Sequence, residues 1–221
     1  DFSITGDIST NHTANGVTIN FGTSSVVGNF YYLNQGSNVV VDADSAEFNF
    51  NENLFSSKGV NYLSVVARVV YVDSCTFKKV TCNVFSGLNS FVDEMDSVTY
   101  IGGTNSTCKR VKVSTKSLNV DGVSLIIDSL IFTQPGTDIF ISANSFLNVT
   151  EYTNLNGTCG DFAALICNSG NAIFNYSGGS IVLDYVKLKN IQALGSSTFT
   201  ANNCLDLGSN TFLCLISEVE N

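Results

Sequence analysis

The chain of 221 residues has no tryptophan, one proline, one methionine and one histidine, and its charge is sparse. Lysine and arginine together number 10 against 19 aspartates and glutamates, which gives a net charge of −9. Without a basic stripe to neutralise phosphates, a nucleic-acid partner is not expected, and binding to a membrane surface through a polybasic patch is excluded. No apolar run approaches the roughly 18–20 residues that span a bilayer, so no membrane span is expected.

The scarcity of histidine and the spacing of the cysteines exclude several kinds of site. None of the seven cysteines forms a C-x-x-C pair, so neither a zinc site nor a haem site is predicted. His12 is the only base available to a cysteine nucleophile, and it lies in a polar stretch, so no catalytic residue is assigned. The best carboxylate pair, Asp42 and Asp44, is a weak calcium candidate and fits a solvated acidic face better. The sequence therefore predicts no metal site, no cofactor and no enzymatic activity.

What the chain does contain is a recurring phrase of the form Asp-Ser-x-x-(Phe/Tyr). It occurs at residues 73–77, 96–100 and 128–132, with a looser copy at 184–188 and a fragment at 197–199. A polar corner followed by alternating apolar residues is typical of a strand with one buried face. A short unit that cannot bury its own apolar face must stack on copies of itself. Because the first two copies lie 23 residues apart, the phrase predicts an all-β solenoid with a repeat of 22–23 residues.

The phrase also predicts which side chains lie in the core. If Asp-Ser forms a corner, the first and third residues after it point inward and the residue between them points outward. The aspartates then cap the corners through side-chain hydrogen bonds, without a catalytic role. The expected inward residues are Cys75, Phe77, Val98, Tyr100, Leu130, Phe132, Val186 and Leu188.

Strand patterns run through the chain, and helix signals are almost absent. The clearest strand patterns are residues 39–41, 69–72, 124–127, 139–141 and 180–183. Residues 102–111 and 148–160 are expected to protrude as loops. Residues 1–27 depart from the phrase and are expected to form an N-terminal cap or assembly arm. Residues 28–221 then form the β-helix domain with glycosylated loop excursions.

Five N-x-S/T sequons are candidate glycosylation sites and indicate an extracellular location, although a chain rich in Asn, Ser and Thr also produces such triplets by chance. They begin at Asn11, Asn105, Asn148, Asn156 and Asn175. The chain begins at Asp1 without a methionine, which fits either a fragment or a mature chain after removal of a signal peptide; both are compatible with secretion.

Cysteine usage points to the same oxidising compartment. Short spacing makes three pairs candidates for disulfides, each closing a loop worth about 2–3 kcal/mol. The pairs are Cys75 with Cys82, Cys159 with Cys167, and Cys204 with Cys214. On this interpretation Cys108 is left over, either as a free thiol or as an intermolecular link.

Three short motifs carry a family resemblance: the Asp-Ser phrases, the stretch 197–202, and Ser177-Gly178-Gly179-Ser180-Ile181. With them the chain, over residues 45–205, resembles secreted right-handed parallel β-helix proteins of the pectate-lyase-like and polymorphic-membrane-protein-like groups. The resemblance implies a right-handed parallel β-helix. It also implies kinship with enzymes that cut acidic polysaccharides using carboxylate-bound calcium with a basic residue, or clustered aspartates with a histidine.

Three functions follow from these patterns. The first is an extracellular, N-glycosylated structural or adhesive protein that self-associates end to end, since open solenoid ends expose unpaired backbone groups, and that contacts cell-surface or matrix glycans. The second is a polysaccharide-binding or polysaccharide-cleaving β-helix enzyme. Phe30, Tyr31 and Tyr32 are candidates for its sugar platform, although the pattern favours core packing for them. The third is a pilin-like β-sandwich subunit that donates residues 1–8 to its neighbour and contains antiparallel hairpins.

Overall fold

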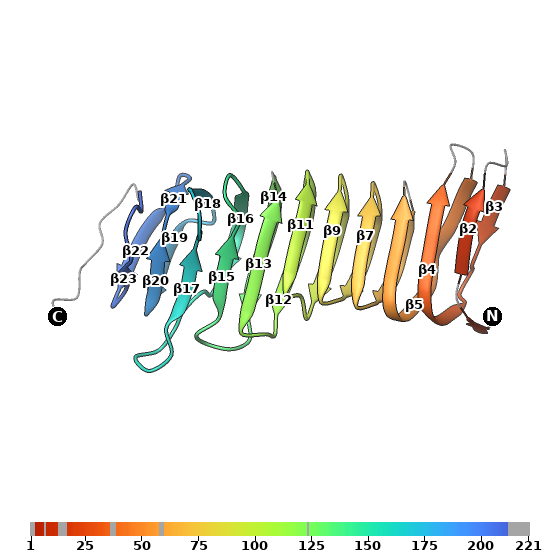
Figure 1. Ribbon diagram of the computed structural model, residues 1–221, viewed down its shortest axis with the longest axis horizontal. Helices are drawn as coiled ribbons and strands as arrows, with labels where there is room; N and C mark the ends of the chain where they lie inside the picture. The colour runs from red at the N-terminus through yellow and green to blue at the C-terminus, as the bar shows by residue number, and fades with distance from the viewer. Residues whose placement is uncertain are drawn as a thin grey trace.

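The protein is a parallel β-solenoid of about nine turns (Figure 1). The computed structural model describes residues 3–6, 8–12, 17–35, 39–57, 60–122 and 124–211. These residues form 23 strands and no helix, with 21 strands in one continuous sheet and two in a second. Every pairing between described strands is parallel, so the predicted β-helix is confirmed and the β-sandwich alternative is wrong. The one antiparallel contact in this part of the chain is a single bridge between Thr158 and Asp161.

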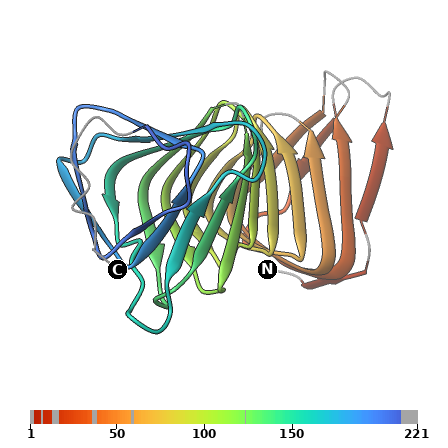
Figure 2. The same cartoon turned by 60° about the vertical axis from the view of Figure 1, so that its left-hand side comes forward.

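Successive turns stack along one axis, and each central turn contributes a strand to two faces of the coil (Figure 2). The bent face comprises β6 (Asn61–Val66), β8 (Thr76–Thr81), β10 (Phe91–Asp96), β12 (Ser106–Val113), β14 (Leu125–Phe132), β16 (Phe146–Thr153), β18 (Ala172–Tyr176) and β21 (Ile191–Leu194). The flat face comprises β7 (Val69–Asp73), β9 (Val84–Leu88), β11 (Tyr100–Thr104), β13 (Ser117–Gly122), β15 (Asp138–Ile141), β17 (Ala163–Ile166), β20 (Val186–Lys189) and β23 (Leu205–Asp206).

The first turns and the last turns depart from this plan. At the N-terminal end, β1 (Ser3–Thr5) and β2 (Ile8–His12) both pair with β4 (Ser25–Gln35), while β3 (Val17–Asn20) pairs with β5 (Val39–Ser57). The described part of residues 1–27 therefore belongs to the first coils of the stack. Near the other end, β19 (Ser180–Asp184) and β22 (Thr198–Asn202) pair as a separate sheet.

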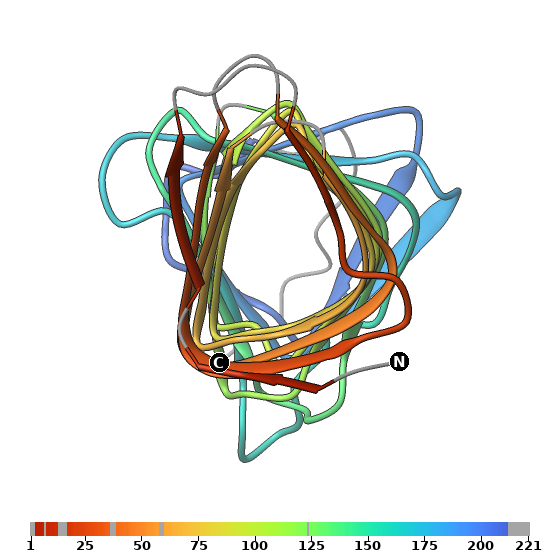
Figure 3. The ribbon, with the colours of Figure 1, turned by 90° about the vertical axis from the view of Figure 1, so that its right-hand side faces the viewer.

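The strands of the bent face turn a corner in mid-strand because their alternation breaks once. In β8 the buried residues Phe77 and Val80 are separated by two exposed lysines, Lys78 and Lys79, instead of one outward residue. The same break recurs in β10 and β12. Two successive outward residues redirect the chain, and the coil seen along its axis has a closed, roughly three-sided outline (Figure 3).

The central turns are shorter than the phrase spacing predicts. Asn61 pairs with Thr76 and Thr76 with Phe91, so these turns take 15 residues, which is also the separation of the hydrogen-bonded Cys75 and Ser90. The next turn, from Phe91 to Thr107, is one residue longer. Later turns widen to 22 and then 27 residues around Asn148. The predicted repeat of 22–23 residues is therefore wrong for the central turns, where the interval between the first two phrases corresponds to about one and a half turns. The first turns do have the predicted length, since Ser25 pairs with Glu47, 22 residues on, and Ile8 pairs with Tyr31, 23 residues on.

The phrase copies consequently lie at three different corners. Residues 73–74 join the flat face to the bent face, residues 96–97 join the bent face to the flat face, and residues 128–129 lie at the bend inside β14. Ser74 and Ser97 adopt left-handed backbone conformations, with φ of 54° and 64°. One and two turns after Ser74 the same corner is made by Asn89 and Asn105, also left-handed, a conformation that asparagine tolerates better than most residues.

The core consists of rows of apolar side chains, each stacked on its counterpart one turn away. All the members of three central rows are buried, and burial of a large apolar side chain contributes about 1.5–3 kcal/mol. The rows are Tyr62, Phe77, Val92, Cys108 and Ile127; Val65, Val80, Met95, Val111 and Leu130; and Val70, Phe85, Ile101, Val120 and Ile141. Of the eight residues expected to point inward, all but Tyr100 are buried.

One expected loop is absent and the other is displaced. Residues 102–111 form parts of β11 and β12, with Asn105 at the corner between them. The second expected loop begins as strand β16, and the excursion from the stack follows it, at residues 154–162. Lys116 holds this excursion, because its Nζ donates to the carbonyl oxygen of Pro135 and to Oδ2 of Asp161, both at 2.6 Å.

The structure contradicts two of the predicted disulfides, since Cys75, Cys82, Cys159 and Cys167 are all free. Strand β8 runs between the first two cysteines and separates them by roughly 20 Å, whereas a disulfide needs Cα atoms within about 7 Å. Strand β17 likewise lies between the other two. Short spacing along a strand therefore keeps cysteines apart, because the strand is extended.

The remaining cysteines are also free where they are described. Cys108 is fully buried, which leaves it no access to a second molecule, and burial raises the pKa of its thiol to about 12. Cys204 is free and buried, and its expected partner Cys214 lies outside the described residues.

Candidate functional site: an aromatic strip on the flat face

The structure separates the sequons into two groups. Asn105 is exposed at a corner, and Asn156 is exposed in the 154–162 excursion. Asn148 and Asn175 are half-buried in β16 and β18, where Asn175 Nδ2 donates to Asn148 Oδ1 at 2.8 Å. A glycan on Asn175 Nδ2 would interrupt this contact between neighbouring rungs. The side chain of the fifth sequon, Asn11, lies outside the described residues.

The other residues singled out in the N-terminal region are described less fully. His12 lies in β2, and Asp42 and Asp44 lie in β5, but their side chains are outside the described part of the chain. In the expected sugar platform, Tyr31 is fully buried and packs against Phe48 with ring centroids 5.4 Å apart. Tyr31 is therefore a core residue and cannot form part of a sugar platform, while the side chains of Phe30 and Tyr32 lie outside the described part of the chain.

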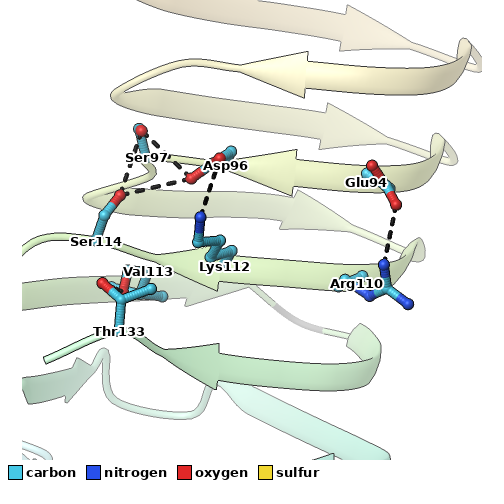
Figure 4. A network of polar contacts seen from close by, with 8 residues as sticks. All are labelled: Glu94, Asp96, Ser97, Arg110, Lys112, Val113, Ser114 and Thr133. Atoms are coloured by element: carbon cyan, nitrogen blue, oxygen red, sulfur yellow. Dashed lines mark hydrogen bonds and ion pairs between the residues drawn. The ribbon is translucent and has the colours of Figure 1, made fainter.

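The four phrase aspartates each accept a side-chain hydrogen bond, and for Asp73 and Asp96 the donor is the serine of the same corner, as expected for a capping role. The donors are Ser74 Oγ to Asp73 (2.8 Å), Ser97 Oγ to Asp96 (3.4 Å), Thr150 Oγ1 to Asp128 (2.8 Å) and Asn203 Nδ2 to Asp184 (2.9 Å). At the Asp96 corner, Lys112 Nζ also lies 3.8 Å from the carboxylate, and Ser114 Oγ lies 3.3 Å from Ser97 Oγ (Figure 4). Asp96, Asp128 and Asp184 thus hold adjacent turns together, whereas the bond of Asp73 stays within its own corner.

A charged groove of about 420 Å³ follows the bend of the bent face. Its lining residues are Asp93, Glu94, Lys109, Arg110, Asp128, Ser129 and Glu151. Both of its cations are paired with carboxylates one turn away. Lys109 Nζ lies 2.8 Å from Asp93 Oδ1. Arg110 Nη1 lies 3.0 Å from Glu94 Oε1, the pair drawn in Figure 4. Such exposed pairs contribute about 0–1 kcal/mol each. Because both lining cations are paired, the groove offers little to an anionic ligand and serves to hold adjacent turns together.

A strip of aromatic and polar side chains follows the outside of the flat face. Phe55 and Tyr71 are register partners on β5 and β7, and their rings stack with centroids 5.1 Å apart and planes 8° apart. Tyr71 is 43% exposed. The next residue of this row is Ser86 on β9, which has only a small side chain. The row therefore begins with a stacked pair of rings and continues into a shallower stretch.

Tyr100 supplies the next ring by leaning sideways along its own strand. Its ring lies over Gly102, the register partner of Ser86. The contact is so close that a Cβ added at Gly102 would lie 2.8 Å from both Cε1 and Oη of Tyr100. Tyr100 Oη donates to Asp121 Oδ2 at 3.3 Å, and Asp121 is the register partner of Gly102 on β13. Burial and the neighbouring Asp121 carboxylate raise the pKa of Tyr100, so the phenol stays protonated as a donor.

The strip ends in a depression of about 200 Å³ rich in amide and hydroxyl groups. Asn119, the register partner of Tyr100, and Phe140, the register partner of Asn119, belong to its lining together with Ser142, Asn168 and Ser169. We use the name aromatic strip for Phe55, Tyr71, Ser86, Tyr100, Asn119, Asp121 and Phe140.

The comparisons with known proteins add no relative. No protein-family model matches the chain, and no curated protein and no solved structure is similar to it at the significance that we required. The described residues contain no helix with the length and apolarity needed to cross a membrane. Within the same residues, no group of three or more histidine, cysteine, aspartate or glutamate side chains is arranged to hold a metal ion.

Sequence reasoning missed the aromatic strip because it used a turn length that does not hold in the central turns. Phe55, Tyr71 and Ser86 follow one another at the length of a central turn. A search for spacings of that length, in place of the longer interval between phrases, would have placed them in one row. Tyr100 would still have been missed, because its ring reaches this row only by leaning over Gly102.

Proposed function

We propose that this protein is an extracellular, N-glycosylated structural or adhesive protein that acts through the outer faces of its solenoid. The observation that carries the proposal is the aromatic strip, which extends over six strands from β5 to β15 in two neighbouring register rows that Tyr100 connects. The inner side of the same sheet is buried, so the strip rests on a rigid support. A long ladder of this kind suits contact with an extended partner better than enclosure of a small molecule.

The extracellular location is supported by the exposed sequons. Asn105 and Asn156 are both exposed, so a glycan on Nδ2 of either would project into solvent, although Asn156 Oδ1 also accepts a hydrogen bond from the backbone N–H of Asp184 at 2.8 Å. The free cysteines lend no support to an oxidising compartment, so this part of the proposal rests on the sequons alone.

End-to-end assembly is supported by the edges of the stack. Among the described strands, β1, β2 and β3 pair with neighbours on one side only, and so does β23. A strand with unpaired backbone groups is a ready template for another strand. Stacked copies would form filaments with an axial repeat of roughly 45 Å, from about nine turns at about 4.8 Å each.

Expression of the full chain behind a secretion signal in a eukaryotic host tests the proposal. We expect protein in the medium and, by negative-stain electron microscopy and light scattering, filaments with the roughly 45 Å repeat. Retention of folded protein inside the cell would contradict the extracellular part. A strictly monomeric protein over a wide concentration range would contradict the assembly part.

We further propose that the protein is not an enzyme. Incubation with neutral and acidic polysaccharides, followed by measurement of newly released reducing ends and of unsaturated products, is expected to show no turnover. Cleavage of either class by purified protein would replace the structural proposal with the polysaccharide-cleaving alternative.

A further inference from the structure

We propose that the aromatic strip binds a neutral polysaccharide chain that lies along the solenoid axis. The inference rests on the proposed adhesive function and deepens it by naming the class of partner and the residues that contact it. It requires three properties of the strip: ring faces open to solvent, hydrogen-bonding groups beside them, and a charge that suits an uncharged ligand.

The rings present the apolar part of such a site. One face of a pyranose carries C–H groups that pack against an aromatic ring, while the hydroxyl groups around its rim need polar partners. Tyr71 is 43% exposed and is stacked on Phe55, which fixes the plane of its ring. The ring of Tyr100 packs on Gly102, and its hydroxyl donates a hydrogen bond to Asp121. Both rings are thus held in place before a ligand arrives, which lowers the entropy cost of binding.

Hydrogen-bonding groups lie beside the rings. Asp121 accepts one bond from Tyr100 and, as a carboxylate, has capacity for more. Asn119 is exposed next to it and leads into the depression with Asn168 and Ser142. From β5 to β15 the strip spans five rung intervals, roughly 24 Å, which is long enough to contact several consecutive sugar units.

The charge of the protein selects a neutral chain over an acidic one. The net charge is −9, and the charged residue of the strip itself is a carboxylate, Asp121. A polyuronic acid would meet like charge at the strip, and the cations that line the groove of the bent face are already paired. A neutral polysaccharide keeps the ring contacts and the hydrogen bonds without that repulsion.

Affinity electrophoresis and isothermal titration of the full chain with soluble galactomannan, hydroxyethyl cellulose and polygalacturonate test the inference. We expect binding to at least one neutral polymer and none to polygalacturonate. The variants Tyr71→Ala and Tyr100→Ala should each weaken that binding about tenfold or more. Tyr152→Ala is the matched control, because Tyr152 is a 50% exposed tyrosine on the bent face and its removal should leave binding unchanged.

A second variant separates loss of contact from loss of fold. Gly102→Ala keeps both tyrosines, but its methyl group would lie 2.8 Å from Tyr100 Cε1 and Oη and would displace the ring from its position over residue 102. We expect weaker binding with a circular dichroism spectrum like that of the parent protein. Tyr100→Phe, which keeps the ring, should retain most of the affinity.

Two results would overturn the inference: no binding to any of the neutral polymers, or binding that is unchanged in both tyrosine-to-alanine variants. Stronger binding to polygalacturonate than to the neutral polymers would overturn the choice of partner. The proposed function fails separately, through retention in the cell or absence of assembly, so a secreted filament that binds no neutral polymer would reject this inference alone.

Discussion

At the scale of single residues, the place of a side chain in the turn decides which of its atoms are available. Asn105 and Asn175 both begin sequons, yet Asn105 stands at an exposed corner whereas Asn175 uses its Nδ2 to bond Asn148 one turn away. The sequence motif is equivalent in the two cases. The difference between them arises from the fold, through the register that sets one asparagine above another.

This difference predicts glycan occupancy. In folded protein secreted from a eukaryotic host, we expect a glycan on Asn105 and none on Asn148 or Asn175, because the latter two are half-buried and hydrogen-bonded. Glycopeptide mass spectrometry, with enzymatic deglycosylation in heavy water to mark the sites, measures occupancy directly. The variant Asn105→Gln serves as control and should lose the corresponding mass. Full occupancy of Asn175 in folded molecules would refute the prediction.

How much can be predicted from the sequence differs between kinds of residue. The corner aspartates can be recognised, since a short polar side chain before a turn has few other uses. Disulfide pairs cannot be recognised in this way, since close spacing along the chain does not mean a short distance when the intervening residues form an extended strand. The binding candidates Tyr71 and Tyr100 could not be found, because they are neighbours only through the register of turns whose length was unknown.

At the scale of the strand, stability comes from inward rows that continue from one turn to the next. Phe77 illustrates this: it is fully buried, stacks on Tyr62 with ring centroids 5.0 Å apart, and meets Phe85 edge-on. Its neighbour Thr76 points outward in the same strand and is exposed. The alternation that places both residues correctly is local, so it could be predicted from the sequence. The two successive outward residues Lys78 and Lys79 could not be predicted, since in the sequence they look like any short polar stretch between apolar residues.

The two positions make a matched pair for mutation. Phe77→Ala should lower the free energy of unfolding by about 3–5 kcal/mol, because it removes a buried ring and leaves a cavity between two other rings. Thr76→Ala, at the adjacent outward position, should change it by less than about 0.5 kcal/mol. Urea denaturation followed by circular dichroism measures both. Equal effects of the two substitutions would show that the inward register is wrong.

At the scale of the whole molecule, the unit of construction is one turn of the coil, and its length varies along the axis. The central turns, of which Asn61 to Thr76 is an example, take 15 or 16 residues, so the interval between the first two phrases does not close a turn. Stacking of parallel turns was predictable, because repeated one-sided strands have no other way to cover their apolar faces. The length of the central turns was not predictable, because similar phrases at different corners imitate a regular repeat.

Two deletions distinguish these units. Removal of residues 76–90 takes out one turn and brings Phe91 into register with Asn61, so the chain should fold cooperatively with one rung fewer. Removal of residues 73–95 takes out one phrase interval and restores an Asp-Ser phrase at the junction, yet it joins the flat face directly to the end of β10. We expect this second protein to aggregate or to unfold without cooperativity. Thermal denaturation and size-exclusion chromatography compare them, and a better-folded second deletion would contradict the assigned turns.

The different corners occupied by the phrase also bear on ancestry. No shift along the axis superposes residues 73–77 on residues 96–100, because one set enters the bent face and the other enters the flat face. A gene duplication of phrase length would have exchanged the two faces of every later turn. The resemblance between the copies therefore reflects a recurring physical solution to a tight corner, and any tandem duplication in the history of this chain is to be sought at the length of one turn.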